Sequence, residues 1–221
     1  MNKLFIVASL LAAFMSLVVY GQDENQARDL FQSYAATGKG QPGAKIKIEL
    51  RREGEQRFVP LNTVFRAGDR VKLHFEVNFP AYVEIYNHGS SGQYQRLFPA
   101  PGTNALVKVS SNYVVPSQAT EWFEFDDHPG TEQLSFIFSE AQLQPVSKPS
   151  PSTRPDSRRK SPGVTVNPES RTQQAINDLN TRALDEGRDL NRVQVKDEHY
   201  VFGSAERLHR AVGIVINLKH Q

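Results

Sequence analysis

The most constraining feature of this sequence is the strict alternation of apolar and polar residues in several short segments. It begins at Ile46, which is separated from Ile48 and Leu50 by charged residues. The same alternation recurs in residues 71–77 and 83–86. Because successive side chains of a strand point to opposite faces, this period of two predicts strands with one buried and one solvated face.

Further strands are predicted where short apolar segments lie between turn-forming residues. They are expected at residues 94–98, 106–110, 121–125, 133–138 and 212–218. Many short alternating strands separated by regular turns are typical of an antiparallel sandwich or barrel. The predicted fold is therefore mainly β: an antiparallel β-sandwich, Ig-like or similar, with one or two short appended helices and a disordered basic excursion rich in proline and serine.

Changes of composition divide the chain into six segments. The segment 145–168 is rich in proline, serine and basic residues and lacks the apolar content that offsets chain entropy, so it is predicted to be disordered. Since a strand is predicted beyond it, this segment is expected to be an internal excursion. The predicted segments are 1–21, a signal peptide; 22–44, a helix from Asp23 to Ala36 and a glycine-rich connector; 45–144, the β-sandwich domain; 145–168, the disordered linker; 169–187, an amphipathic helix; and 188–221, strands that return to the sandwich.

The N-terminus predicts export. Lys3 precedes an apolar run from Leu4 to Val19, and Gly21 is small enough to stand before a cleavage site at Gln22. A retained N-terminal helix is the alternative, but the run is short for a membrane span. We therefore expect a periplasmic or secreted chain whose mature part is not inserted into a membrane.

Cysteine content and charge exclude several classes of function. The chain has no cysteine, so disulfides, thiolate metal sites and thiol catalysis are excluded. The net charge is +2, and residues 145–170 contain five basic and two acidic residues, which leaves the rest of the chain close to neutral. Nucleic-acid binding is therefore not expected. The densest positive charge, at Arg158, Arg159 and Lys160, is predicted to contact anionic envelope polymers in a salt-dependent way.

The segment Asp126–Gly130 contains residue types that bind metals. Pro129 and Gly130, however, fit the central pair of a type II turn, in which glycine takes a positive φ. Asp126, Asp127 and His128 lead into that turn, where short polar side chains can bond nearby backbone amides. Adjacent aspartates in an extended segment also point to opposite faces. The sequence therefore favours a structural turn between two strands of a hairpin, and no metal or cofactor is predicted.

Aromatic and acidic residues are predicted on the face opposite the core. Tyr82, Tyr86 and Trp122, together with Glu84 and Glu124, would form a patch suited to sugar rings or a protein partner. We call these five residues the aromatic patch. The alternative is that one of the predicted helices covers them.

No catalytic arrangement is recognisable in the sequence. The histidines near the C-terminus, His199, His209 and His220, are scattered and lack the HExxH spacing of zinc enzymes. The GSSG sequence at 89–92 is not a nucleophile elbow. Asp69 is expected to shape the turn before its strand instead of acting as a base. We therefore predict that the chain is not an enzyme.

Four sequence blocks, in this order, resemble a known bacterial family. They are FRAGDRVKLHFEVN, AYVEIYNHGSSGQYQRLFP, WFEFDDHPGTEQLSFIFS and the closing INLKH. The family is domain of unknown function 4384, and the resemblance extends from about the first helix to the last strand. It implies an exported protein, since such domains occur in exported proteins and beside kinase or peptidase domains. The family has no established activity, so the resemblance assigns no catalytic residue.

The expected function is that of a non-catalytic exported cell-envelope interaction module that binds a protein partner. One alternative is a carbohydrate- or peptidoglycan-binding module that uses the aromatic patch. The other is a metal-assisted hydrolase built around Asp126, Asp127 and His128.

Overall fold

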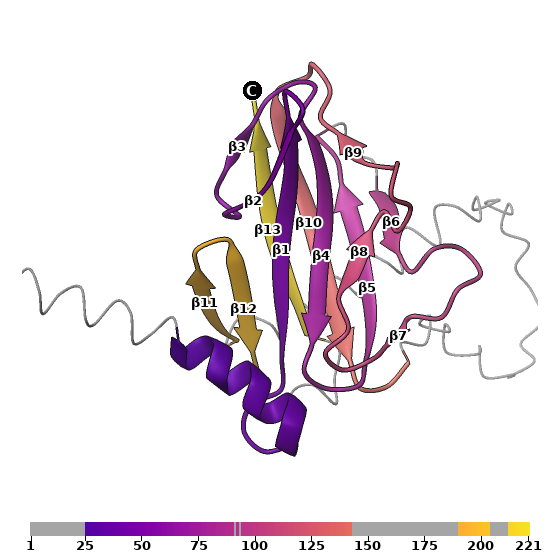
Figure 1. Cartoon of the computed structure of the whole chain (residues 1–221). Coiled ribbons are helices and arrows are strands. Elements are labelled where there is room, and N and C mark those ends of the chain that lie inside the picture. The colour runs from indigo at the N-terminus through magenta and orange to yellow at the C-terminus, as the bar shows by residue number, and fades with distance from the viewer. Residues whose placement is uncertain (1–24, 91, 93, 143–189, 204–211) are drawn as a thin grey trace, which may run out of the picture.

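The computed structural model shows two β-sheets packed face to face, with a helix at one end (Figure 1). It describes residues 25–90, 92, 94–142, 190–203 and 212–221. The mainly β sandwich predicted from the alternation is therefore confirmed.

Sheet A contains seven strands, and all of its pairings are antiparallel. β2 pairs with β1, and β9 pairs with β4, outside the main order of the sheet. The main order is β11 (Asn191–Val195), β12 (Glu198–Phe202), β1 (Gly43–Arg52), β4 (Arg70–Val77) and β8 (Tyr113–Val115), and the two others are β2 (Glu55–Val59) and β9 (Phe123–Glu124).

Sheet B contains six strands, and the C-terminal strand β13 lies within it, next to β10. Its pairings are antiparallel except that of β13 with β3, which is parallel. β7 pairs with β5 outside the main order. The main order is β3 (Val64–Phe65), β13 (Val212–His220), β10 (Gly130–Ser139), β5 (Ala81–His88) and β6 (Tyr94–Phe98), and the sixth strand is β7 (Leu106–Val107).

The core lies between the two sheets and is made by the alternating residues. Ile46, Ile48 and Leu50 of β1 are fully buried, as the period of two predicts. Phe75 of sheet A meets Phe136 of sheet B edge to face, with ring centroids 6.4 Å apart. Each large apolar side chain buried in this way stabilises the fold by roughly 1.5–3 kcal/mol.

Several elements differ from the prediction. β7 and β9 have two residues each, although longer strands were expected at 106–110 and 121–125. The strands β2, β3 and β8 were not predicted, whereas β11 and β12 lie in the segment 188–221, where returning strands were predicted without individual bounds. β2 shows why, because four of its five residues are exposed and its sequence EQRFV has no apolar alternation. A strand held mainly by its hydrogen bonds to β1 leaves no such pattern in the sequence.

Residues 25–37 form a helix at the end of the sandwich away from the C-terminus (Figure 1). Ala27 and Phe31, one turn apart, pack on Tyr200 and Phe202 of β12 in a small second core. The helix ends at Gly38, whose positive φ of 66° and bond from its amide to the Tyr34 carbonyl are typical of a helix C-terminus. An ion pair of 3.0 Å between Arg28 of the helix and Glu198 of β12 also joins the two elements.

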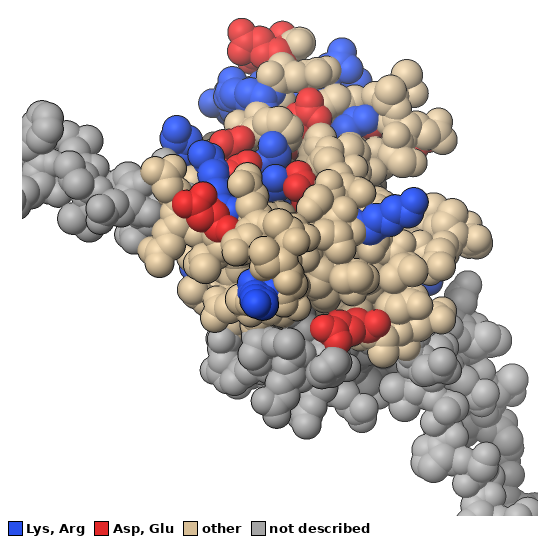
Figure 2. Space-filling model, turned by 60° about the horizontal axis from the view of Figure 1, so that its bottom comes forward, with Lys and Arg blue, Asp and Glu red and all other residues tan. Residues whose placement is uncertain are grey.

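Basic and acidic side chains are interspersed on the face shown in Figure 2, without a large field of one sign. Some of the described basic and acidic residues form ion pairs, such as that of 2.7 Å between Lys45 and Glu76. Among the described residues, no helix is long and apolar enough to cross a membrane. The signal peptide, the linker with Arg158, Arg159 and Lys160, and the helix predicted at 169–187 lie outside the described residues.

Candidate functional site

A pocket of about 850 Å³ opens between the two sheets, at the end of the sandwich where the C-terminus lies (Figure 1). We call it the inter-sheet pocket. Its apolar floor combines Val71, Leu73 and Phe123 of sheet A with Leu134 and Leu218 of sheet B. Val71, Leu73, Leu134 and Leu218 are almost fully buried, so the floor is formed by residues of the core.

Three polar residues of sheet B line this pocket because the inward-facing rows of three strands end in polar side chains. On β13 the buried series that includes Ile216 and Leu218 continues to His220. On β10 and β5 the corresponding positions are Glu132 and Asn87. β13, β10 and β5 are neighbours, so the three side chains gather at the same end of the sheet. We call them the polar triplet.

His220 is the most unusual member of the polar triplet. Its side chain is 2 % exposed, yet neither ring nitrogen has a hydrogen-bond partner among the residues that the structure describes. Glu132 Oε1 lies 3.9 Å from His220 Nε2, too far for a hydrogen bond. The Phe125 ring packs against the imidazole at a centroid distance of 5.1 Å. Buried polar groups without partners are rare in folded proteins and call for an explanation.

Glu132 and Asn87 are oriented by hydrogen bonds. The Asn87 side-chain nitrogen donates to Glu132 Oε2 at 2.8 Å, and the Ser90 backbone amide donates to Glu132 Oε1 at 3.1 Å. Because a carboxylate cannot donate, the Asn87 nitrogen must face Glu132. The Asn87 carbonyl oxygen is then left buried and without a partner.

This arrangement does not match an acid–base–nucleophile relay. Such a relay needs the acid and the nucleophile on different nitrogens of the histidine. Here Glu132 lies on the Nε2 side of His220. Ser90 Oγ forms no hydrogen bond with His220, since both ring nitrogens lack a partner among the described residues. The polar triplet is better suited to accept hydrogen bonds from a bound group than to activate a hydroxyl.

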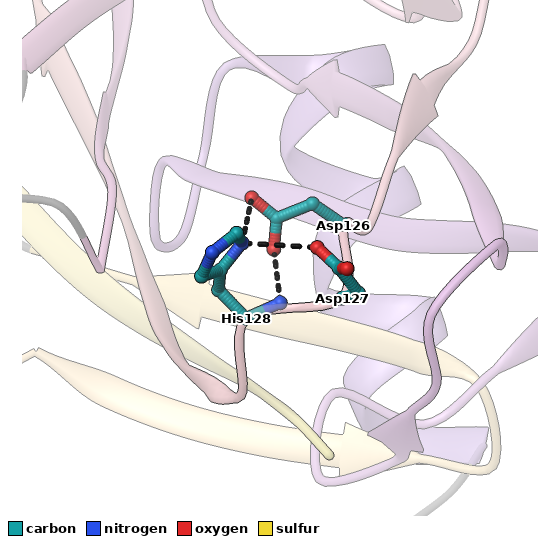
Figure 3. A group of neighbouring side chains, drawn as sticks. All are labelled: Asp126, Asp127 and His128. Carbon is teal, nitrogen blue, oxygen red and sulfur yellow. Dashed lines mark hydrogen bonds and ion pairs between the residues drawn. The ribbon is translucent and has the colours of Figure 1, made fainter.

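Asp126, Asp127 and His128 form a second polar cluster (Figure 3), and Asp126 and His128 also line the pocket. His128 Nδ1 lies 3.0 Å from Asp127 Oδ1 and 3.8 Å from Asp126 Oδ2, and one donor atom from each residue lies within 4.8 Å of the others. The expectation that the two aspartates diverge is therefore wrong. The segment is not extended, because the His128 amide donates to Asp126 Oδ1 at 2.9 Å and curls the chain.

These three side chains could contact a metal ion, but they are 64–87 % exposed to solvent. Exposed acidic groups commonly come this close without an ion. The local bond to the His128 amide agrees with the structural role predicted for these residues.

The predicted hairpin turn at Pro129 and Gly130 is wrong. Gly130 does not have a positive φ and is the first residue of β10. β9 pairs with β4 in sheet A, whereas β10 lies in sheet B, so the chain here crosses between sheets. Glycine is required for a different reason: a Cβ at Gly130 would lie 2.6 Å from the Cβ of Ser90.

The aromatic patch does not exist as one surface. Tyr82, Glu84 and Tyr86 alternate with the inward residues of β5 and face outward from sheet B. Trp122 lies instead on the outer face of sheet A, where Lys72 Nζ is 5.0 Å from its ring. Glu124, also in sheet A, pairs with Arg70 at 2.8 Å. The outward direction of these side chains was predicted correctly, but the residues lie on two different sheets.

Tyr86 is itself not available as a contact surface. It is buried, and its hydroxyl donates to Glu84. Burial raises the pKa of Tyr86 well above its ordinary value, and the hydrogen bond to Glu84 and the charge of that carboxylate add to the effect. The phenol therefore stays neutral.

Asp69 shapes the turn before β4, as predicted, and also anchors a neighbouring strand. Its carboxylate accepts the Arg66 backbone amide at 2.8 Å and both Nε and Nη2 of Arg52 at the end of β1. The side chain is 3 % exposed. Burial by itself would raise the pKa of Asp69, but these hydrogen bonds and the charge of Arg52 outweigh it and hold the pKa below its ordinary value.

The polar triplet was not predicted, although the sequence carries a signal for it. The period of two that predicts β13 extends beyond Leu218 to place His220 on the buried face. The same extension from Leu134 reaches Glu132, and from Ile85 it reaches Asn87. A polar residue in phase with a buried row is the pattern to look for. That the three rows end side by side follows from the strand order.

The fold and the pocket define a β-sandwich domain with a ligand-sized cavity between its sheets. Residues 64–142 match the family described as Domain of unknown function (DUF4384), and this part of the chain belongs to that family. The match runs from β3 to just past β10, so Asn87 and Glu132 lie within it and His220 lies beyond it. No curated protein and no solved structure matches the chain.

Proposed function

We propose that the chain is a non-catalytic, exported interaction module of the cell envelope that binds a protein partner in the inter-sheet pocket. The observation that carries this proposal is the pocket itself, with its apolar floor and its buried acceptors that lack partners. Its volume of about 850 Å³ falls within the range of roughly 300–1,000 Å³ that ligand sites occupy. The export component rests on the basic and apolar N-terminal residues.

A protein partner is favoured over a carbohydrate. Trp122, the most suitable platform for a sugar ring, has Lys72 and Arg51 within 5.0 Å and 6.0 Å of its ring. The tyrosines proposed to act with it lie on the other sheet. The pocket instead combines an apolar floor with a few oriented polar groups, which suits the end or a side chain of a polypeptide.

Site-specific photocrosslinking tests this proposal. A photoreactive residue would replace Gln95, which is exposed and lines the pocket, and the exported chain would be irradiated in the envelope fraction. Leu97→Trp introduces bulk into the pocket wall, and Ser90→Phe introduces it at the rim. Leu30→Trp is the matched control, because Leu30 is an exposed leucine of the helix at the opposite end.

We expect one discrete, protease-sensitive adduct that is lost in Leu97→Trp and Ser90→Phe and retained in Leu30→Trp. Melting curves establish that each variant is folded before its crosslinking is compared. An adduct sensitive to glycan-cleaving enzymes but not to protease would contradict the protein partner. An adduct that survives both pocket variants would place the contact elsewhere on the chain.

A further inference from the structure

The lining of the inter-sheet pocket has an excess of negative charge. Its described residues include three carboxylates and no lysine or arginine. Glu124 is compensated by Arg70 at 2.8 Å, and Asp126 lies 3.8 Å from the His128 ring. Glu132, by contrast, has no described lysine or arginine within ion-pair distance, and the His220 ring nitrogen is 3.9 Å away. A partly buried carboxylate without a cation favours a ligand that supplies one.

The polar triplet presents three acceptors to such a ligand. Glu132 contributes a carboxylate oxygen, and Asn87 contributes its buried, unpartnered carbonyl oxygen. His220 contributes a ring nitrogen, which accepts a hydrogen bond when the imidazole is neutral. A primary ammonium group has three N–H donors, so it can satisfy all three acceptors at once.

The apolar floor lies immediately next to these acceptors. One inward position along from Glu132 is Leu134, and one inward position along from His220 is Leu218. Phe123 and Leu73, the floor residues that sheet A contributes, face these leucines from the opposite sheet. The ligand that fits therefore carries an ammonium group directly beside a bulky apolar group. A lysine side chain separates its ammonium from the backbone by four methylenes and ends in no apolar group that could fill the floor.

We propose that the inter-sheet pocket captures the N-terminal residue of its partner polypeptide, with the α-ammonium group on the polar triplet and a hydrophobic first side chain on the apolar floor. This inference rests on the proposed function and specifies its ligand. Partners with a free α-ammonium are available in the envelope, because removal of a signal peptide creates one on each exported protein. Capture of chain ends by small sets of oriented polar groups is a known mode of peptide recognition.

Leucinamide is the simplest probe of this site, because it carries an α-ammonium beside a leucine side chain. We would titrate it into the exported chain, with EDTA in all samples, and follow the imidazole resonances of His220 by NMR. The comparison probes are N-acetyl-leucinamide, which lacks the ammonium, and N-acetyl-lysinamide, whose ammonium lies at the end of its side chain. We expect saturable shifts with leucinamide and binding at least about tenfold weaker with either comparison probe, which corresponds to about 1.4 kcal/mol.

Glu132→Gln tests the charge on a nearly unchanged shape, and Glu121→Gln, at an exposed position outside the pocket, is its matched control. We expect Glu132→Gln to weaken leucinamide at least about tenfold and Glu121→Gln to leave it unchanged. Equal binding of N-acetyl-leucinamide, equal binding of N-acetyl-lysinamide, or no shift of His220 would each overturn the inference. If the photocrosslink at Gln95 persists while leucinamide fails, the protein-binding function stands and the N-terminal ligand falls. If leucinamide binds but the photocrosslink at Gln95 is lost, the ammonium-binding site stands and the protein-binding function falls.

Discussion

Gly130 is the first residue of β10, and the loop after β5 passes close to it at Ser90. The nearest atom to a Cβ at this position is the Cβ of Ser90, at 2.6 Å, followed by Ser90 Oγ at 3.3 Å and His220 Nε2 at 3.6 Å. A side chain here would therefore press the loop outward and intrude on the polar triplet. The constraint is close approach of two chain segments, because the backbone conformation itself is open to any residue.

We predict that Gly130→Ala lowers the free energy of unfolding by about 1–3 kcal/mol, as overpacking of a tight contact does, and that Gly130→Val lowers it further. Urea denaturation measures both. Asp127→Ala and His128→Ala, at exposed positions a few residues away, should each stay within about 0.5 kcal/mol of the parent chain.

The cause assigned to Gly130 can be separated from backbone strain by a double substitution. Ser90→Gly removes the atom that the new side chain meets. The double variant should therefore recover much of the stability lost in Gly130→Ala when it is compared with Ser90→Gly. If the two effects simply add, then close approach to Ser90 is not the reason for glycine here.

The lowered pKa of Asp69 makes the stability of the fold depend on pH. Its pKa is held below the ordinary value in the folded chain. A carboxyl group of this kind stabilises the fold above its unfolded pKa of about 3.9, and the contribution is lost as the pH falls through the folded value.

We predict that Asp69→Asn lowers the free energy of unfolding by about 3–5 kcal/mol at pH 7, because it removes the charged partner of Arg52 in a buried pair. The difference from the parent chain should shrink as the pH falls below about 4. Urea denaturation at pH 7 and pH 3 gives both values. A difference that stays constant between the two would show that the charge of Asp69 does not stabilise the fold.

Among the strands, β13 is important to the fold although it lies at the end of the chain. It pairs with β10 along all nine of its residues, from Val212 to His220, and with β3 on its other side. It buries Ile214, Ile216 and Leu218 in the main core. The final residues of the chain are thus an interior strand of sheet B, and they also supply His220 to the pocket.

We predict that deletion of residues 212–221 unfolds or aggregates the chain, because it removes core side chains and exposes the edge of β10. Replacement of residues 145–161 by a short glycine-serine linker should leave the melting temperature nearly unchanged, since loop-closure entropy changes by only about 0.6 kcal/mol per doubling of length. Melting curves of both variants provide the comparison. If the linker replacement is the more damaging, residues 145–161 have structure that their composition does not predict.

For the molecule as a whole, the helix and the inter-sheet pocket occupy opposite ends of the sandwich. The helix over residues 25–37 packs on β12 at one end, and the inter-sheet pocket opens at the other (Figure 1). The binding proposed for the pocket would therefore take place away from the helix.

We predict that the exported chain begins at Gln22 or within a few residues of it. N-terminal sequencing of the chain recovered from the soluble envelope fraction checks this directly. Recovery of an uncleaved chain beginning at Met1 from the integral membrane fraction would contradict the prediction.

The period of two determined which residues form the main strands and which of their side chains are buried. Ile46, Phe75 and Phe136 face the core because a strand has a fixed alternation that any apolar series must follow. The role of Asp69 in its turn was predictable for a similar reason, because its main contacts in that turn are local. These properties depend on neighbours in the sequence, so the sequence by itself was sufficient.

Which strands lie side by side depends on the tertiary structure and could not be read from the sequence. Trp122 and Tyr86 have the parity expected of them, yet they stand on opposite sheets. His220 and Glu132, 88 positions apart in the numbering, meet because β13 pairs with β10. Alternation specifies the face of a strand but not its partner, and partners are chosen by long-range packing and hydrogen bonding that no local pattern records. The inter-sheet pocket is a product of that pairing, and so is the function proposed for it.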